Sequence, residues 1–448
     1  MVSVIQTAAA GSNAKIEKLT VIEGNFVDIQ FEHGAIYRFH SEWLRDACRD
    51  ETYVSMGAGE RRLHKTQLVI ETSADIKAIH TSIEEDGWVK ISFDNGDNCL
   101  FAPEMLAAFA ANEVAKHISG PTIVANNVDW IKPFSGVPDA PAPSSIKLWR
   151  GQTGGAIPVM QWSEVMTPEG NLQMLKHLLE GHGAVRVKGV RDPGAAALHR
   201  FIDYTCGGLQ KDPSRDEANW KIERKESAAS VSYNPSTRLN NHSDQSLPNH
   251  GIPGLFLTMH YAAGWGANTI VDSFAAAEDL RRDDPEAFRL LSTYGNDQER
   301  DLLASRQDAN QPHTASLCLT SAATIIQLDS KGGIRRIQYN EVFRTPVSVP
   351  FEHFKEWYAA YLKFGRMLES EKYERELPMD TGDFMIVNNW RVLHGRAGAR
   401  DGSDIGKISP DRCLVGGTVT RENAFSRVRA LLKEVEGVQL FGPRAFTA

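Results

Sequence analysis

His242 and Asp244, an imidazole and a carboxylate two positions apart, are the residues of this 448-residue chain best suited to carry chemistry. On a strand, residues i and i+2 point to the same face, so both side chains can reach one ion. A third ligand must come from a distant segment, and His394 fits because it ends an apolar stretch. Two histidines and one carboxylate form the facial triad of non-haem iron(II) oxygenases, which leaves coordination positions for a co-substrate and O₂. We therefore predict that these three residues bind catalytic iron.

Neighbouring histidines offer alternatives to this ligand set. His250 and His260 follow the H-x-D pair within a short distance. His260 ends an apolar run, and a histidine in that position is more often packed in the core than bound to a metal.

The co-substrate of such an oxygenase needs a cation for its far carboxylate, and arginine suits this role because its planar fork makes two parallel hydrogen bonds. Arg412 begins the next apolar stretch after His394, so a hairpin would return it to the metal. Arg396 and Arg400 are nearer in sequence, but we expect them in an exposed glycine-rich loop. Thr269 is a candidate for a hydroxyl contact to the same carboxylate, although alone it is an ordinary strand residue.

Alternating apolar and polar positions predict many short strands around these residues. The expected strands cover 20–39, 86–101, 183–189, 254–260, 268–274, 324–328, 334–339, 383–389 and 412–419. Helices are expected over 103–117, 172–179, 275–291 and 351–371. Short strands joined by long excursions favour a mainly β fold, a double-stranded β-helix or jelly roll with helical buttresses, over a doubly wound sheet.

The pattern also predicts the domain organisation. Residues 1–125 are expected to form a small β-rich accessory domain. A proline- and serine-rich linker follows over 126–150, and the jelly-roll catalytic domain occupies 151–448.

Bulk properties narrow the class of protein. The formal net charge of -8 gives no reason to expect binding to nucleic acid or to an anionic membrane. No apolar run is long enough to span a bilayer, and the N-terminus has neither a secretory signal nor the arginines of a mitochondrial presequence. The five cysteines form no CxxC pair, which is typical of reduced thiols. These features favour the cytoplasm or another reducing compartment.

Several segments resemble the γ-butyrobetaine and trimethyllysine dioxygenases of the wider taurine-dioxygenase-like superfamily. The resemblance covers nearly the whole chain and is carried by NNHSDQSLPNHGIPGLFLTMHYAAGWGANTIVDSFAAAEDL, NNWRVLHGR, ENAFSRVRAL and the N-terminal WLRDACRD. It implies an Fe(II)- and 2-oxoglutarate-dependent dioxygenase that uses O₂, releases succinate and CO₂, and hydroxylates an unactivated C–H bond. It also implies that His242, Asp244 and His394 bind iron and that Arg412 and Thr269 contact 2-oxoglutarate.

The resemblance further suggests which residues contact the substrate. Relatives hold a trimethylammonium group in an aromatic cage by cation–π attraction. Tyr233 and Trp220 match two cage positions, whereas Thr418 and Asp216 stand where two further aromatic residues are expected. Asn340 matches another substrate-side position. The half-kept cage leaves open a small substrate that is cationic, betaine-like or of another shape.

Two further expectations follow from the resemblance. The accessory domain of the family carries a zinc ion on three cysteines and a histidine, but here Cys48 lacks such neighbours, so we predict no zinc and a buried Cys48 thiol. The family also implies a homodimer, with a small molecule as the only other partner.

Two other functions stay open from the sequence. The same cofactors can support desaturation or ring formation on a biosynthetic intermediate, and product mass would separate these from hydroxylation. A jelly roll retained as a non-catalytic scaffold is disfavoured because all three iron ligands and Arg412 are present.

Overall fold

The computed structural model describes residues 15–48, 53–55, 60–61, 75–111, 113–123, 146–211, 217–223, 238–244, 253–301, 318–321, 323–329, 332–397 and 409–437. The chain forms two compact units. Unit 1 comprises 1–137, 284–325 and 341–366, and unit 2 comprises 138–283, 326–340 and 367–448. Among the described residues, no helix is long and apolar enough to cross a bilayer.

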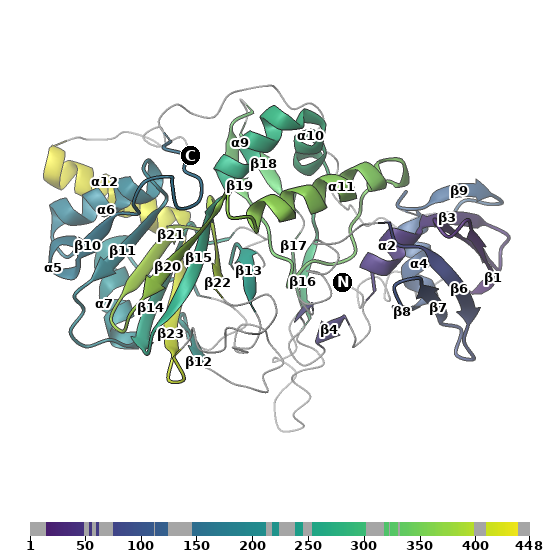
Figure 1. The fold of residues 1–448 in the computed structure, drawn as a ribbon, viewed down its shortest axis with the longest axis horizontal. Helices are drawn as coiled ribbons and strands as arrows, with labels where there is room; N and C mark the ends of the chain where they lie inside the picture. The colour runs from purple at the N-terminus through teal and green to yellow at the C-terminus, as the bar shows by residue number, and fades with distance from the viewer. Residues whose placement is uncertain are drawn as a thin grey trace. The chain divides into compact units, whose positions relative to one another are not determined.

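Unit 1 is built on two small antiparallel sheets (Figure 1). One has the order β1-β2-β3-β9, and the other is the meander β6-β7-β8. The elements of this unit are β1 (Ile16–Ile22), β2 (Phe26–Phe31), β3 (Ile36–His40), α2 (Ser41–Asp46), β4 (Val54–Ser55), β5 (Glu60–Arg61), β6 (Ala78–Ile83), β7 (Val89–Phe93), β8 (Asn98–Phe101), α4 (Pro103–Ala111), β9 (Lys116–Ser119), α10 (Pro285–Thr293), β16 (Gln298–Asp301), β17 (Cys318–Ser321) and most of α11 (Phe351–Leu368).

Unit 2 contains a sheet of order β10-β11-β21-β14-β23-β12 and a second sheet of order β13-β22-β15-β20, as far as the described residues extend. Its strands are β10 (Val159–Gln161), β11 (Ala184–Lys188), β12 (Trp220–Glu223), β13 (Leu239–His242), β14 (Phe256–Ala263), β15 (Gly266–Asp272), β18 (Ile326–Leu328), β19 (Ile334–Ile337), β20 (Glu374–Met379), β21 (Phe384–Asn388), β22 (Val392–Arg396) and β23 (Cys413–Val419). Its helices are α5 (Trp162–Val165), α6 (Pro168–Leu179), α7 (Ala195–Cys206), α9 (Ser273–Asp283) and α12 (Arg421–Glu436).

The two sheets of unit 2 enclose one core and carry helices outside. Leu257 and Met259 of β14 pack with Ile270 of β15 and Val392 of β22, so the inner faces of the two sheets meet. A second core lies between the outer face of the longer sheet and helices α6, α7 and α12 (Figure 1). This is the jelly-roll arrangement expected from the sequence, and the predicted mainly β fold class is confirmed.

Most expected elements are present, but two helix predictions were wrong in part. The helix expected over 103–117 ends at Ala111; Glu113 has a positive φ of 63°, which interrupts the helix, and Lys116–Ser119 joins β3 as a strand instead. The helix expected over 275–291 is two helices, because Pro285 cannot continue α9 and Asp284 caps α10 through the backbone N–H of Ala287.

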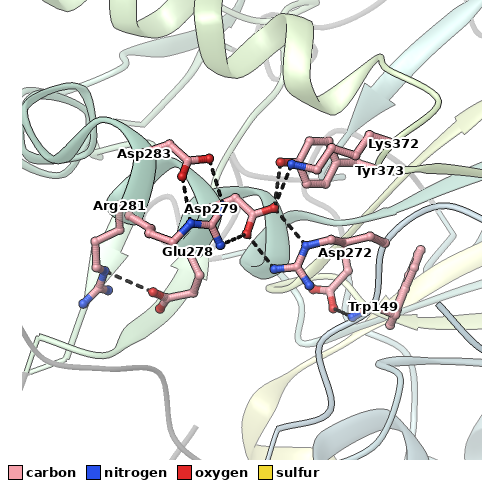
Figure 2. A network of polar contacts seen from close by, with 10 residues as sticks. Trp149, Asp272, Glu278, Asp279, Arg281, Asp283, Lys372 and Tyr373 are labelled. Carbon is pink, nitrogen blue, oxygen red and sulfur yellow. Dashed lines mark hydrogen bonds and ion pairs between the residues drawn. The ribbon is translucent and has the colours of Figure 1, made fainter. Parts of the chain in front are cut away.

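An ionic cluster around Asp279 ties α9 to the segment around Arg150 and to the residues just before β20 (Figure 2). The buried Asp279 carboxylate receives two hydrogen bonds from Arg150, at 2.8 and 2.7 Å, and one from the Tyr373 hydroxyl at 2.8 Å. Lys372 lies 3.1 Å away. Burial opposes ionisation, but these donors outweigh it and hold the pKa of Asp279 well below its usual range. Since Tyr373 immediately precedes β20, the cluster fixes the start of that strand.

Candidate metal and co-substrate site

Three predicted ligands converge at the end of the second sheet. His242 ends β13 and is the direct register partner of His394 on β22. The two ring centroids lie 4.3 Å apart. Asp244 follows the strand, with Oδ1 3.3 Å from Nε2 of His242 and Oδ2 3.7 Å from Nε2 of His394. One ligand atom from each residue lies within 4.8 Å of the other two, the only such metal-type cluster in the described part of the chain.

The donor set fits a divalent transition metal. Nδ1 of His242 donates to the carbonyl of Asn240 at 2.7 Å, so in the neutral imidazole the lone pair is on Nε2, which faces Asp244. Two imidazole nitrogens and one carboxylate oxygen on one side of an ion are the facial-triad pattern.

The electrostatic environment shifts the pKa values of the two triad histidines in opposite directions. Burial, together with the charge of neighbouring His242, lowers the pKa of His394 to about 3, although Asp244 opposes the shift. Burial disfavours the charged form of His242 as well, but its hydrogen bond to Asp244 and the charge of that carboxylate raise its pKa. His394 is therefore held in the neutral form that binds metals.

The turn that carries Asp244 is held by Asn389, which the sequence reasoning did not single out. The N–H of Asp244 donates to Oδ1 of Asn389 at 3.0 Å, and Nδ2 of Asn389 donates to the carbonyl of Asp244 at 3.0 Å. The same Nδ2 reaches the carbonyl of Gly254 at 3.1 Å.

The other side of the turn is held by Tyr339 and Asn340. The backbone N–H of Ser243 donates to the carbonyl of Tyr339 at 2.8 Å. Nδ2 of the buried Asn340 donates to the carbonyl of Ser243 at 3.0 Å. Asn340, predicted on the substrate side, thus lies directly against the metal-binding turn.

Thr269 lies on the opposite face of the sheet from His394. In the β15–β22 register Thr269 pairs with Gly395 and Ile270 pairs with His394, and side chains alternate between faces along a strand. The Thr269 hydroxyl is buried and donates to Oδ1 of Asn241 at 2.8 Å. The predicted contact between Thr269 and the co-substrate therefore does not fit this register.

Asn268 instead shares the face of the triad. It pairs with Arg396, two residues beyond His394 on β22. Its Oδ1 accepts from the Tyr261 hydroxyl at 2.9 Å, while its Nδ2 is buried and has no partner among the described residues. An amide donor is thus oriented toward the interior beside the triad.

Arg412 and this amide both contact Tyr261. The guanidinium carbon of Arg412 is 5.4 Å from the centre of the Tyr261 ring. A β-carbon built on Gly266 would lie 3.4 Å from Arg412 Nε and 3.6 Å from the Tyr261 hydroxyl. The glycine therefore leaves room for the side chains of Arg412 and Tyr261 to lie close together. Burial raises the pKa of Tyr261, although Arg412 opposes the shift. The hairpin expected between His394 and Arg412 is not formed, because β22 and β23 belong to different sheets, and the position of Arg412 beside the metal stays a prediction.

Arg396 was expected in an exposed loop, and that expectation is wrong. It belongs to β22 and is 3% exposed, because the strand extends past Gly395 and pairs on both sides, with Leu239 and Asn268. Burial and the positive charge of Arg412 lower the pKa of Arg396 to about 9. Two arginines and an amide donor together suit a carboxylate.

The candidate substrate residues are only partly described. Trp220 is buried on β12, and its ring lies over Gly416, where a β-carbon would come within 2.4 Å of it. Thr418 is buried on the same strand as Gly416 and pairs with Leu257. Tyr233 and Asp216, as well as His250 and Arg400, lie outside the described residues.

Two further residues that the sequence reasoning missed, Asn241 and Arg391, support the ligand strands. Asn241, between the bulged end of β13 and β20, accepts from Thr269 and donates to Glu374 Oε2 at 2.6 Å. Arg391 makes a buried two-point ion pair with Asp272, at 3.0 and 2.7 Å. The doubled asparagines before His242 and before Trp390 are a sequence signal that could have pointed to Asn241 and Asn389.

Comparison with known proteins supplies the family context. The model of the "Taurine catabolism dioxygenase TauD, TfdA family" matches residues 151–407, more than half of the chain. A second model, "Gamma-butyrobetaine hydroxylase-like, N-terminal", matches residues 21–107.

Curated relatives agree with both matches. Gamma-butyrobetaine dioxygenase of Pseudomonas sp. is 27% identical over 90% of this chain and 93% of its own length. The human protein of that name is 27% identical over 62% of this chain and 68% of its own. Trimethyllysine dioxygenase of Neurospora crassa is 30% identical over 37% of this chain and 31% of its own.

Proposed function

The chain belongs to the TauD, TfdA family of dioxygenases, and we propose that His242, Asp244 and His394 are the ligands of its catalytic iron. It is an Fe(II)- and 2-oxoglutarate-dependent dioxygenase. The observation that carries the ligand assignment is the convergence of one atom from each residue within 4.8 Å, with the Nε2 atoms of both histidines close to the carboxylate.

The reaction is hydroxylation of an unactivated C–H bond. Iron(II), when bound, supplies the redox chemistry by which O₂ and 2-oxoglutarate yield succinate, CO₂ and the hydroxylated substrate. One oxygen atom enters succinate and the other enters the product, so the atoms balance. The chain's own residues position the ligands and exclude water, since all but Asp244 among the three are buried.

The 2-oxoglutarate site is assigned to Arg412 and Asn268. Arg412 offers a planar fork to the carboxylate farther from the iron, and Nδ2 of Asn268 offers a further donor. Tyr261 orients both, by its hydrogen bond to Asn268 and its ring beneath Arg412. Arg396 adds positive potential from β22. Thr269 would then act from the outer face, by holding Asn241 behind His242.

The substrate is proposed to be of the size of a small betaine, a short chain with a carboxylate at one end and a nitrogen group, cationic or neutral, at the other. The similar gamma-butyrobetaine and trimethyllysine dioxygenases are named after small molecules of this size, which supports the proposal. Trp220, Thr418 and Asn340 are assigned to the substrate side, together with Tyr233 and Asp216. Trp220 and Thr418 line one inner strand pair, and Asn340 abuts the metal-binding turn.

Organisation and location are also proposals. Residues 1–125 would be an accessory domain and 151–448 the catalytic domain, which the family matches at 21–107 and 151–407 support. Segments 284–325 and 341–366, which pack in unit 1, would be insertions of the catalytic part. We further propose a homodimer that acts in the cytoplasm and binds no nucleic acid, in keeping with its net charge of -8.

The assignment is tested by anaerobic iron(II) binding. Wild-type protein should take up one iron per chain, and His394→Ala should lose most of its affinity. His117→Ala, which removes an exposed imidazole of unit 1, is the matched control and should bind as wild type. Equal binding by His394→Ala and the control would refute the ligand set.

A further inference from the structure

Gln210 is a buried carboxamide without a hydrogen-bond partner among the described residues. The residue is 5% exposed, and both Oε1 and Nε2 are buried and unpartnered. Its backbone N–H donates to the carbonyl of Thr418 at 2.7 Å, so Gln210 continues the sheet edge beyond β12. Buried amides in native proteins are nearly always hydrogen-bonded, because burying both polar atoms otherwise goes uncompensated.

The Gln210 side chain points into the jelly roll. Its Oε1 lies near the Thr418 side chain, and Thr418 pairs with Leu257 of the core between the two sheets, whereas the neighbouring Leu209 packs on Gly417 and on the outer core. A β-carbon built on Gly254 would lie 3.1 Å from Oε1 of Gln210 and 2.9 Å from the Thr418 hydroxyl oxygen. The carboxamide and this hydroxyl therefore flank one point beside Gly254.

That point adjoins the metal-binding turn. The carbonyls of Gly254 and Asp244 accept from the same Nδ2 of Asn389, at 3.1 and 3.0 Å. On the same strand pair, Trp220 presents a buried indole N–H that has no partner in the described part of the chain. Two independent unpartnered groups thus lie along β23, the carboxamide of Gln210 near the metal-binding turn and the indole N–H of Trp220 opposite Gly416.

We propose that Gln210, with Trp220, recognises an amide group of the substrate, an inference that rests on the function proposed above. A carboxamide both donates and accepts, so it pairs reciprocally with another amide, and the indole N–H can donate to the second lone pair of the amide oxygen. A trimethylammonium group donates no hydrogen bond and prefers aromatic faces, and Thr418 offers none. A carboxylate would leave Oε1 unpaired, and an ammonium would leave the N–H donors unpaired.

Two probes separate these possibilities because they share a carboxylate and a chain of three methylenes. Glutaramate ends in a carboxamide, and γ-butyrobetaine ends in a trimethylammonium. Binding is measured by calorimetry without O₂, on protein loaded with iron(II) and 2-oxoglutarate. Wild type should bind glutaramate at least about tenfold more tightly than γ-butyrobetaine. Equal or tighter binding of γ-butyrobetaine, or no binding of glutaramate, would overturn the proposal.

The variant Gln210→Met removes the carboxamide with little change of volume, and Gln173→Met, on the exposed face of α6, is its control. Gln210→Met should lose glutaramate affinity about tenfold and keep its 2-oxoglutarate affinity, whereas Gln173→Met changes neither. Should Gln210→Met not fold, Trp220→Phe, which removes only the indole N–H donor, should weaken glutaramate several-fold. Unchanged glutaramate affinity in the folded variant would assign Gln210 a structural role. If the wild-type protein did not bind 2-oxoglutarate, that result would instead refute the proposed function.

Discussion

The side chain of Asn389 hydrogen-bonds to both backbone groups of Asp244. Its Oδ1 accepts from the N–H of Asp244, and its Nδ2 donates to the carbonyl of Asp244, each at 3.0 Å. Asp244 follows β13 and is not itself part of a strand. Asn389 lies five residues before His394. The position of the Asp244 carboxylate therefore depends on a side chain from the segment that carries the ligand His394.

Removing this support should weaken iron binding without removing a ligand. For Asn389→Ala we expect the dissociation constant for iron(II) to rise roughly 10–100-fold, the usual effect of losing an outer-shell partner. Anaerobic titration measures it, with Asn98→Ala, on an exposed hairpin, as the control. Wild-type affinity in Asn389→Ala would mean that the backbone clamp is dispensable.

Substitution of Asn268 should weaken the binding of 2-oxoglutarate, whereas substitution of Thr269 should leave this affinity nearly unchanged. Asn268→Leu removes a donor to a carboxylate, so the dissociation constant should rise roughly tenfold or more, since hydrogen bonds to charged groups contribute about 1.5–3 kcal/mol. Thr269→Val should leave that constant within about threefold while lowering stability, because Asn241 loses a buried donor. Calorimetry on the iron-loaded protein without O₂ reports both constants, and the reverse order would restore Thr269 as the contact.

The affinity for 2-oxoglutarate should depend on the planar shape of the Arg412 guanidinium as well as on its charge. Arg412→Lys keeps the charge but loses the two-point fork, so we expect weaker 2-oxoglutarate binding than wild type and tighter binding than Arg412→Met. The concentration of 2-oxoglutarate needed for half-maximal succinate formation gives the ranking. An unchanged requirement in Arg412→Met would move the anchor role to Arg396.

The Arg391–Asp272 pair should carry much of the stability of β22. Its guanidinium and carboxylate are 1% and 0% exposed, so removing one partner leaves a buried charge and costs about 3–5 kcal/mol. Thermal unfolding of Arg391→Met should show a clearly lowered midpoint. The double variant with Asp272→Leu should recover part of the loss, and failure to do so would indicate that the other hydrogen bonds of Arg391, to Gly181 and Lys147, dominate.

His260 should make the stability pH-dependent. It is buried against Phe384, donates from Nδ1 to the Asp383 carbonyl and accepts the N–H of Gly194 on Nε2, which confirms the expectation of a packed residue. Burial lowers its pKa to about 4, although the Asp383 carbonyl opposes the shift. An unfolded histidine titrates near about 6.5, so the unfolded chain binds more protons between these values.

The neutral His260 therefore stabilises the fold fully above about pH 6.5, and this contribution declines as the pH falls toward about 4. The loss should be of the order of 3 kcal/mol. Unfolding midpoints across this range should fall less steeply with acid in His260→Gln than in wild type. If the midpoints of wild type and His260→Gln changed in parallel with pH, His260 would not be a source of the pH dependence of stability.

The sequence could identify the ligands because their chemistry and spacing are local. His242 and Asp244 need only a strand end, and His394 only an apolar strand before it. The face occupied by Thr269 depends on the register between β15 and β22, where a slip of one residue exchanges inside and outside, and no local pattern sets that register. Arg396 was misjudged for a related reason: Gly395 suggested a turn, but it allows close approach, since a β-carbon there would lie 2.5 Å from the Leu239 carbonyl. The break at Pro285 was readable, because an Asp-Pro pair is a typical helix start.

Iron-dependent conversion of 2-oxoglutarate to succinate tests the role of the triad most directly. Wild-type protein with iron(II) and O₂ should form succinate, and a chelator should abolish it. His242→Ala, checked for folding by its melting temperature, should form no more succinate than the chelated wild type. Equal succinate formation by wild type and His242→Ala would contradict the assignment of the triad as the catalytic iron site.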